Sequence, residues 1–488
     1  MNRNKILTVL TNPFFVILLL LFINLIISTF SPMNNDEGMW CYIGRVWSQH
    51  GIPPYTGTVE NKTPGIFELH ALSNFLFGIN VFFVRGLGLI AVLLSAFTVY
   101  LIGKEIHSHL AGIFSMYLFG LISTWGMSNG IFISHTEVFM VLFSTLSFHF
   151  VIKAEKSINW KYRIFMAGIF MGFAIAFKQI AITTAFGLLL FYLYTFSTDR
   201  KQHKITGILL LGMGCFISTC VSILPILASG VTIKEYIDGA WLILLNSGSS
   251  STLSAHISGF INVFVFSRFA FFYPFLFILY WHRDLLKNRY FVGLFIWILF
   301  DFIGVISSGY YYGHQFRQLI PSFSIIIGIL LTTFISGLLN QNKIKSSYLI
   351  VVLSVIFVIM LPFKSLYLGI GPLLGKTQNN PDKELGIWIN KNTTKNDYVY
   401  LIDISSSPAL AYSDRISSSK YFNSIFITTD KERNIVLTDL ISKPPAIILK
   451  QNSASGSPIH MGPEIEKWIS LHYTFDTEKY GYDILKKK

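Results

Sequence analysis

Eleven apolar runs, each near the length of a membrane-crossing helix, constrain this chain of 488 residues more than any other feature. A hydrocarbon core about 30 Å thick needs roughly 20 apolar residues per helical span. Only 13% of the residues are charged, whereas soluble domains carry about a quarter. We therefore predict an all-α polytopic membrane domain. The runs lie near residues 13–31, 79–102, 110–127, 131–152, 164–177, 180–197, 205–229, 259–281, 290–308, 318–338 and 347–363.

The basic residues predict the orientation of these spans, because cytoplasmic loops carry an excess of Lys and Arg. With a cytoplasmic N-terminus, fifteen basic residues border the inner side and five lie in outer connections before residue 364. The formal net charge of +13 follows from this topology, so no nucleic-acid partner is implied. The five outer residues are Arg45, Lys62, Lys178, Lys234 and Arg317.

The end of the chain differs from the rest in composition. From about residue 376 the sequence becomes polar and charged and contains no run long enough to span. We therefore predict a soluble extracytoplasmic α/β domain over 376–488, which follows a transmembrane catalytic domain over 1–363. Within the soluble domain, residue spacing predicts a helix over 382–391 and strands over 398–402 and 446–449.

The first outer loop, residues 32–78, is the other long segment between spans. We expect short amphipathic helices near 39–49 and 66–77, lying at the membrane interface. The aromatic residues of the loop fit stacking on a sugar ring, but an interfacial aromatic belt is the simpler interpretation. These residues are Trp40, Tyr42, Trp47 and Tyr55.

Polar residues gather at the outer ends of the spans once this topology is adopted. Charges at a bilayer edge are costly unless paired, so a cluster of both signs indicates a functional site. Neighbouring carboxylates can supply a general base, and Lys, His and Arg can stabilise a phosphate leaving group. The pattern therefore indicates group transfer from a phosphate-activated donor. The residues are Asp36, Glu37, Lys62, His135, Glu137, Lys178, Gln179, His314, Gln315 and Arg317.

Simpler interpretations compete with this one. An acidic pair such as Asp36-Glu37 is equally typical of a helix N-terminus, where the macrodipole favours negative charge. Lys178 differs, because only a two-residue polar turn separates the apolar runs around it. Four other loop charges are expected to be ordinary solvated side chains. These are Arg45, Lys234, Glu235 and Asp238.

Motifs of soluble enzymes are missing from the sequence. It contains no P-loop, no G-x-G-x-x-G after a strand, no G-x-S-x-G elbow and no H-E-x-x-H. We therefore expect the membrane itself to present the activated donor. Cys41, Cys215 and Cys220 have neither zinc spacing nor the density of a disulfide scaffold. No cofactor is predicted with certainty, and a divalent metal is allowed but not indicated.

Three segments carry a resemblance to a known family. The first outer loop contains Asn35-Asp-Glu-Gly38, Gly51-Ile-Pro-Pro-Tyr55 and Asn61-Lys-Thr-Pro-Gly65. Later segments are Ser134-His-Thr-Glu-Val-Phe139 and Tyr311-Tyr-Gly-His-Gln-Phe-Arg-Gln-Leu-Ile-Pro321. Together they resemble the GT-C superfamily of polytopic glycosyltransferases, within it the dolichyl-phosphate-mannose-protein mannosyltransferase-like group that includes lipid A aminoarabinose transferases. The chain departs from the usual pattern at Thr63, His135 and Gln315, where Pro, Asn and Tyr are common.

The resemblance implies a fold of the GT-C type and a hexosyl or pentosyl transferase of a bacterial plasma membrane. The donor would be a polyprenyl-phosphate monosaccharide, the acceptor a hydroxyl of a lipid, glycan or protein, and the reaction would invert the anomeric carbon. Asp36 would be the general base, with Glu37 beside it as a catalytic candidate. Lys62, Lys178, Arg317 and His314 would bind the donor phosphate. Glu137, Gln179, Gln315 and Tyr55 would support the donor or acceptor.

Two other functions remain open at this point. An oligosaccharide ligase or polymerase would use a lipid diphosphate donor in the same setting. A transporter of lipids or glycans would also place charges within the membrane, although its sites tend to lie near the midplane. Arg85, Arg268 and Asp301 fall inside apolar runs and favour a transporter, unless they are buried structural residues.

Overall fold

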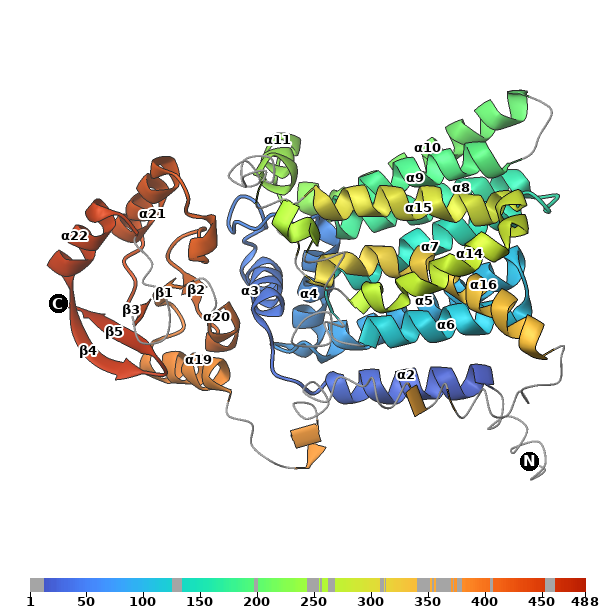
Figure 1. Cartoon of the computed structure of the whole chain (residues 1–488). Coiled ribbons are helices and arrows are strands. Elements are labelled where there is room, and N and C mark those ends of the chain that lie inside the picture. Colours follow the sequence, from blue (N-terminus) through green and yellow to red (C-terminus); the bar gives the residue numbers. More distant parts are fainter. Residues whose placement is uncertain are drawn as a thin grey trace. The chain divides into compact units, whose positions relative to one another are not determined.

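The computed structural model describes residues 13–124, 134–196, 201–243, 268–307, 313–339, 380–403, 407–452 and 461–488, with short pieces between these ranges. The chain divides into two compact units, which are described separately here (Figure 1). The first unit comprises residues 1–31, 85–222 and 246–376, and the second comprises 32–84, 223–245 and 377–488.

The first unit is a bundle of apolar helices. Six helical segments are long and apolar enough to cross a membrane by length and composition, and four shorter ones are apolar. The six involve α5 (Phe82–Ile106), α7 (Thr136–Ala154), α8 (Trp160–Phe177), α10 (Lys201–Ala228), α15 (Arg289–Ile306), and η5 (Gly313–Leu319) continued by α16 (Ile320–Leu339). The shorter ones involve α2 (Pro13–Ser28), α6 (His109–Thr124), α9 (Ala181–Thr195), and η3 (Arg268–Phe277) continued by α14 (Ile278–Trp281).

These helices correspond to the first ten apolar runs of the sequence. The eighth run differs in detail, because η3 is a 3₁₀ segment with Pro274 inside it, and proline removes a backbone donor from a regular α-helix. The eleventh run, 347–363, lies outside the described residues except for Val352, Val355 and Ile356. A short 3₁₀ helix, η4 (Arg283–Lys287), connects α14 to α15.

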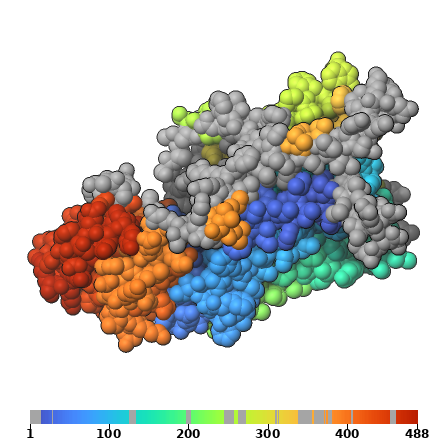
Figure 2. Space-filling view, turned by 90° about the horizontal axis from the view of Figure 1, so that it is seen from below, coloured from blue at the N-terminus to red at the C-terminus, as the bar shows by residue number. Residues whose placement is uncertain are grey.

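Small residues let the helices approach closely, as is common in membrane bundles. A Cβ at Gly168 of α8 would lie 2.2 Å from the Leu211 carbonyl oxygen of α10. Elsewhere in the bundle, Phe148 of α7 stacks on Trp297 of α15 with ring centroids 3.7 Å apart. Figure 2 shows α2 on the outside of the bundle, where Phe14 packs edge-on against Tyr100 of α5.

The second unit begins with the first outer loop, which forms two helices. Helix α3 (Asn35–His50) starts at a capping box, in which the Asn34 side chain accepts from the Glu37 amide and the Glu37 carboxylate accepts from the Asn34 amide. It ends at Gly51, whose positive φ of 65° suits a left-handed C-cap. Helix α4 (Pro64–Phe77) starts with a proline, and α11 (Ile233–Ile237) and η1 (Asp238–Leu242) also belong to this unit.

The chain ends in a small α/β domain built on five strands. The strand order is β2-β1-β3-β5-β4, with β1 parallel to β2 and β3, and with β5 antiparallel to β3 and β4. Tyr400, Val436, Leu440 and Ile448 lie in its core. The elements are α19 (Pro381–Asn392), β1 (Tyr398–Ile402), α20 (Ser407–Ser413), β2 (Ile416–Ser417), η6 (Ser424–Phe426), α21 (Asp430–Ser442), β3 (Ile447–Gln451), α22 (Pro463–His472), β4 (Tyr473–Lys479) and β5 (Tyr482–Lys487).

Most expected elements of this region are present. The predicted helix at 382–391 and the strands at 398–402 and 446–449 correspond to α19, β1 and β3. The structure thus confirms a polytopic helical domain with a small C-terminal α/β domain. The boundaries at 363 and 376 stay a prediction.

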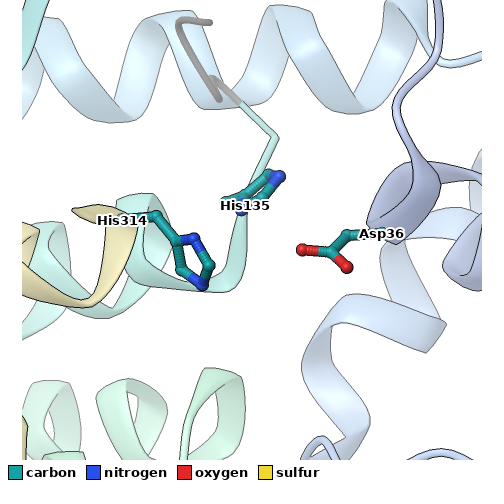
Figure 3. Close-up of side chains that lie close together, drawn as sticks. All are labelled: Asp36, His135 and His314. Carbon is teal, nitrogen blue, oxygen red and sulfur yellow. The ribbon is translucent and has the colours of Figure 1, made fainter. Parts of the chain in front are cut away.

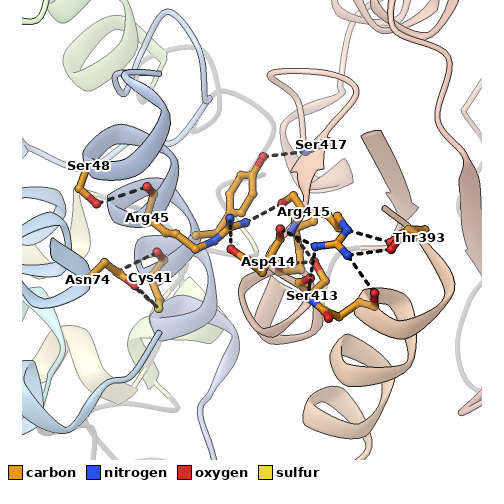
Figure 4. Close-up of polar contacts among 12 residues, drawn as sticks. Cys41, Arg45, Ser48, Asn74, Thr393, Ser413, Asp414, Arg415 and Ser417 are labelled. Carbon is orange, nitrogen blue, oxygen red and sulfur yellow. Dashed lines mark hydrogen bonds and ion pairs between the residues drawn. The ribbon is translucent and has the colours of Figure 1, made fainter. Parts of the chain in front are cut away.

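Helix α3 packs directly on the C-terminal domain within the second unit. A Cβ at Gly38 would lie 2.3 Å from the Pro408 backbone nitrogen of α20, so only glycine fits there. Arg45 donates to Asp414 Oδ1 over 3.1 Å and to the Arg415 carbonyl oxygen over 2.6 Å (Figure 4). The first outer loop and the last hundred or so residues therefore share one core.

Two expectations for this loop are wrong. Arg45 is not a solvated loop charge, because its side chain is fully buried. The aromatic residues Trp40, Tyr42 and Tyr55 do not form an interfacial belt, because they are 1%, 2% and 8% exposed inside the protein. The Tyr42 hydroxyl instead accepts from the Ser417 amide over 2.9 Å. The expected solvation of Lys234 is confirmed by its 84% exposed side chain.

Candidate functional site

The centre of the site in the first unit is a buried ion pair. Glu137 lies in the first turn of α7, and Lys178 is the residue at which α8 ends in an extended conformation. The Lys178 ammonium contacts the Glu137 carboxylate, and the two side chains are only 9% and 2% exposed. Because both charges are shielded from water, each is stabilised by the other and by nearby polar groups.

Two histidines lie beside this pair. His135 is the N-cap residue of α7, and His314 lies in η5. Their rings meet edge to face with centroids 5.4 Å apart, and Figure 3 shows the two imidazoles next to each other. The His314 Nε2 atom is 3.7 Å from Glu137 Oε1. The imidazoles offer nitrogen ligands of the kind that transition metals prefer, while the cofactor prediction itself stays a prediction.

Arg317 completes the set of charges. It lies in η5 with 9% exposure. Together with Glu137 it lines a small cavity whose other walls are mostly apolar. The guanidinium and the carboxylate interact electrostatically across this space. The remaining lining residues are Val92, Ser95, Phe119, Ser123, Val138, Val141 and Ile320.

The charge balance of this group favours an anion. Lys178 and Arg317 contribute two positive charges and Glu137 one negative charge, which leaves one formal positive charge with neutral histidines. The N-terminus of α7 adds a partial positive charge at the same place. Since the side chains are largely shielded from water, their field is stronger than it would be on a surface. A phosphate diester is an anion of matching charge.

The remaining polar candidates of this unit flank the same elements. Gln179 follows Lys178 in the turn that leads into α9 and is 5% exposed. Gln315 lies between His314 and Arg317 in η5 and is 8% exposed. Their predicted role in supporting donor or acceptor stays a prediction.

The two acidic candidates of the second unit differ in their local use. Both lie in the first turn of α3, and Figure 3 shows the Asp36 carboxylate extending from that turn. Glu37 is 1% exposed and serves the capping box through its bond to the Asn34 amide, 3.1 Å long. Asp36 is half-buried and is not part of the cap. Glu37 therefore has a structural role in the capping box. The catalytic role of Asp36 stays a prediction.

Lys62 and Tyr55 meet in the loop between α3 and α4. The Lys62 ammonium donates to Asn61 Oδ1 over 2.6 Å and to Glu60 Oε1 over 3.1 Å. The Tyr55 hydroxyl donates to the Lys62 carbonyl oxygen over 2.7 Å, and its backbone has a positive φ of 70°. Burial raises the pKa of the Tyr55 phenol well above its ordinary value. Their proposed contact with substrate stays a prediction.

Sequence reasoning missed several buried polar contacts. Asp301, which favours a transporter unless it is a buried structural residue, accepts hydrogen bonds from Thr184 and Gln318. Arg85 donates to the carbonyl oxygens of Thr29 and Ser31 over 2.7 and 2.6 Å, which is the structural burial anticipated as its simpler explanation. The Arg268 side chain lies outside the description. The only feature of the sequence that indicates these contacts is the presence of a charged residue inside an apolar run.

The chain is similar to known proteins in both sequence and fold. The family model of dolichyl-phosphate-mannose-protein mannosyltransferase matches residues 61–224. ArnT from Cupriavidus metallidurans, in a crystal structure with bound undecaprenyl phosphate, matches with a TM-score of 0.61 at 14% identity, covering 96% of both chains. The archaeal oligosaccharyltransferase AglB from Archaeoglobus fulgidus, in complex with an inhibitory peptide and a dolichol-phosphate, matches with a TM-score of 0.54 at 13% identity, covering 89% of this chain and 69% of that one. The comparison with curated proteins finds no match.

The fold is therefore that of the GT-C membrane glycosyltransferases. Within this class, the chain is similar to the dolichyl-phosphate-mannose-protein mannosyltransferase family and to ArnT, which confirms the resemblance carried by its motifs. The protein is accordingly an integral membrane protein.

Proposed function

We propose that the protein transfers a monosaccharide from a polyprenyl-phosphate donor to a hydroxyl acceptor, with inversion, on the outer face of its membrane. The observation that carries the proposal is the buried group of Glu137, Lys178 and Arg317, with its one net positive charge. The similarity to ArnT bound to undecaprenyl phosphate supports a lipid phosphate as the group that this site binds.

The chemistry requires a leaving group to be stabilised. As the bond between the anomeric carbon and the phosphate oxygen breaks, negative charge grows on the polyprenyl phosphate. Lys178 and Arg317 are held in place before the reaction and shielded from water, so they stabilise that charge without reorganisation. Glu137 orients the Lys178 ammonium through their ion pair.

The acceptor hydroxyl must lose its proton as it attacks. We assign this role to Asp36, because it follows the first span, lies in the first turn of α3 and does not serve the capping box. A carboxylate base typically contributes about 10²- to 10⁴-fold to such a step. We further propose a cytoplasmic N-terminus and an extracytoplasmic C-terminal domain, supported by the distribution of basic residues.

A lipid diphosphate carrying an oligosaccharide is the second candidate donor. The similarity to the oligosaccharyltransferase AglB supports it at the level of the fold. The charge balance favours the monophosphate, because a diphosphate carries more negative charge than the single net positive charge of Glu137, Lys178 and Arg317 can match.

The test uses the full-length protein in nanodiscs. It is incubated with a membrane extract as the source of the hydroxyl acceptor and, separately, with an undecaprenyl-phosphate monosaccharide or an undecaprenyl-diphosphate oligosaccharide, and the lipid and glycosylated products are identified by mass spectrometry. Release of undecaprenyl phosphate from the first donor together with acceptor-bound sugar supports the proposal, whereas release with free sugar alone is hydrolysis and contradicts it. Release of undecaprenyl diphosphate from the second donor alone would establish a ligase. Movement of intact lipid between leaflets of proteoliposomes, without any cleavage, would establish a transporter.

A further inference from the structure

A buried polar network joins three elements of the bundle. The Thr184 hydroxyl of α9 donates to Asp301 Oδ1 of α15 over 2.6 Å. The Gln318 side-chain amide of η5 donates to the same carboxyl oxygen over 3.3 Å and to Thr184 Oγ1 over 2.7 Å. The three residues are 1%, 1% and 2% exposed. Each of them therefore contacts the other two in a closed triangle.

Such an arrangement is expensive at this position. Asp301 lies within α15, one of the segments long and apolar enough to span the membrane. Among the described residues, no Lys, Arg or His forms an ion pair with Asp301. The hydrogen bonds from Thr184 and Gln318 instead offset the cost of burying its carboxyl group. An acidic residue kept in an apolar span usually serves function, because leucine would pack there at no such cost.

The backbone around the network is equally constrained. A Cβ at Gly304, one turn after Asp301, would lie 2.4 Å from Thr183 Oγ1 and 3.0 Å from Gln318 Nε2. It would also lie 3.3 Å from the carbonyl oxygen of Ile180, in the turn that begins with Lys178. Helix α15 therefore presses against both this turn and η5.

The turn and η5 also carry the proposed phosphate ligands, Lys178 and Arg317. Gln318 follows Arg317 directly, and Thr184 lies in the first turn of α9, just after the Lys178 turn. Neighbouring residues on a helical turn do not share a face. Gln318 can thus be bound to Asp301 while Arg317 lines the cavity with Glu137.

We propose that Asp301 is a positioning residue for the donor phosphate. Through Thr184 and Gln318 it holds the Lys178 turn and η5 at one separation, so that the ammonium and the guanidinium converge on a single phosphate. Asp301 does not touch the lipid. This inference rests on the proposed function, because it needs Lys178 and Arg317 to be phosphate ligands.

The test compares two variants of the full-length protein in nanodiscs, with undecaprenyl phosphate as the probe. Asp301→Asn keeps an oxygen acceptor, whereas Asp301→Leu replaces both carboxyl oxygens by methyl groups with the same branching. We expect Asp301→Leu to weaken undecaprenyl phosphate binding by about tenfold, by analogy with the loss when the hydrogen-bond partner of a metal ligand is removed. Asp301→Asn should bind undecaprenyl phosphate like the wild type. Native mass spectrometry measures both.

A matched control separates positioning from general loosening. The buried Ser147 hydroxyl of α7 donates to the Ala167 carbonyl oxygen of α8 over 2.7 Å, away from η5. Ser147→Ala should leave binding unchanged. The proposal is overturned if Asp301→Leu binds like the wild type, if Asp301→Asn is as weak as Asp301→Leu, or if Ser147→Ala is equally weak.

Lys178→Met and Arg317→Met separate this inference from the proposed function. If neither weakens binding of the probe, the phosphate site itself is wrong, and the role of Asp301 is overturned with it. If both weaken binding and Asp301→Leu does not, the phosphate site stands and only the positioning role is overturned.

Discussion

Lys178 and Glu137 form an ion pair between the end of α8 and the start of α7, with both side chains shielded from water. Replacing a buried pair by apolar residues is often neutral or stabilising, so stability alone is a weak reason to keep it. The proposed binding of an anionic lipid by Lys178 and Arg317 gives a functional reason to keep it. The Glu137 carboxylate offsets part of the positive charge of these two side chains.

Removing this carboxylate should destabilise the protein. Glu137→Gln leaves Lys178 and Arg317 buried without their counter-ion, which should cost about 3–5 kcal/mol. Thermal unfolding in detergent measures the loss, and added undecaprenyl phosphate should stabilise the variant more than the wild type. Glu105→Gln is the control, because its partners Lys153 and Lys156 are 37% and 65% exposed, which predicts a loss of about 1 kcal/mol or less. Equal losses in the two variants would contradict the prediction.

Substitutions of the two acidic residues of α3, Asp36 and Glu37, should have different effects on turnover. Asp36→Asn removes the proposed base and should lower turnover by at least about a hundredfold, with unchanged undecaprenyl phosphate binding. Glu37→Gln keeps a side-chain oxygen that can accept from the Asn34 amide, so the cap should survive and turnover should be largely retained. Steady-state kinetics and thermal unfolding measure the pair. Turnover lost in Glu37→Gln and kept in Asp36→Asn would place the base one residue later.

Arg45 should hold the C-terminal domain on α3. Arg45→Ala leaves the Arg415 carbonyl group and the partly exposed Asp414 carboxylate without their donor, at a cost of about 1–3 kcal/mol. Limited proteolysis should then cleave the variant faster within residues 377–488. Lys234→Ala, at an 84% exposed side chain, is the control and should be cleaved like the wild type. Identical cleavage of both variants would show that Arg45 is dispensable for docking.

The stability of the second unit should depend on the pH through Glu68. Burial in α4 raises the pKa of this carboxyl group from 4.5 to about 7. The folded state therefore binds more protons than the unfolded state between these values, so stability falls as the pH rises from 4.5 to 7. The fall is at most about 3 kcal/mol. Glu68→Gln should flatten this part of the curve of denaturation midpoint against pH, and an unchanged slope would argue against it.

The orientation can be tested with reporter fusions at Lys488. A periplasmic reporter such as alkaline phosphatase should be active there, because the basic residues predict a cytoplasmic N-terminus and an outer C-terminal domain. A fusion that is active only with a cytoplasmic reporter would reverse the topology, and with it the compartment of Asp36.

Local patterns in the sequence predicted the bundle helices and the elements α19, β1 and β3, whereas the other helices and strands of the C-terminal domain were not predicted. Apolar length identified the spans, and the Asn-Asp-Glu start of α3 and the short strand at 398–402 carry strong local signals. The isolation of Lys178 between two apolar runs correctly indicated a side chain with little access to water, since it is 7% exposed. Such properties depend on residues that are close in sequence.

Long-range pairing could not be predicted in this way. Arg45 looks like any loop arginine until Asp414 is placed beside it, and nothing near it in the sequence indicates that partner. The hydrogen bonds of Asp301 likewise come from Thr184 and Gln318, which belong to other elements. A charge or a carboxyl group can be located from one sequence, but its partner is set by tertiary packing.

The docking of α3 on the C-terminal domain has a consequence for how the protein is made. Asp414 is 369 positions after Arg45, and every described bundle helix except α2 is synthesised between them. Helix α3 leaves the ribosome early, yet Tyr42, Arg45 and Gly38 cannot contact their partners until the last quarter of the chain has been translated. Until then, the face of α3 that contacts the C-terminal domain is uncovered. A chain that stops after the bundle would keep its spans and leave this face of α3 accessible to chaperones and proteases.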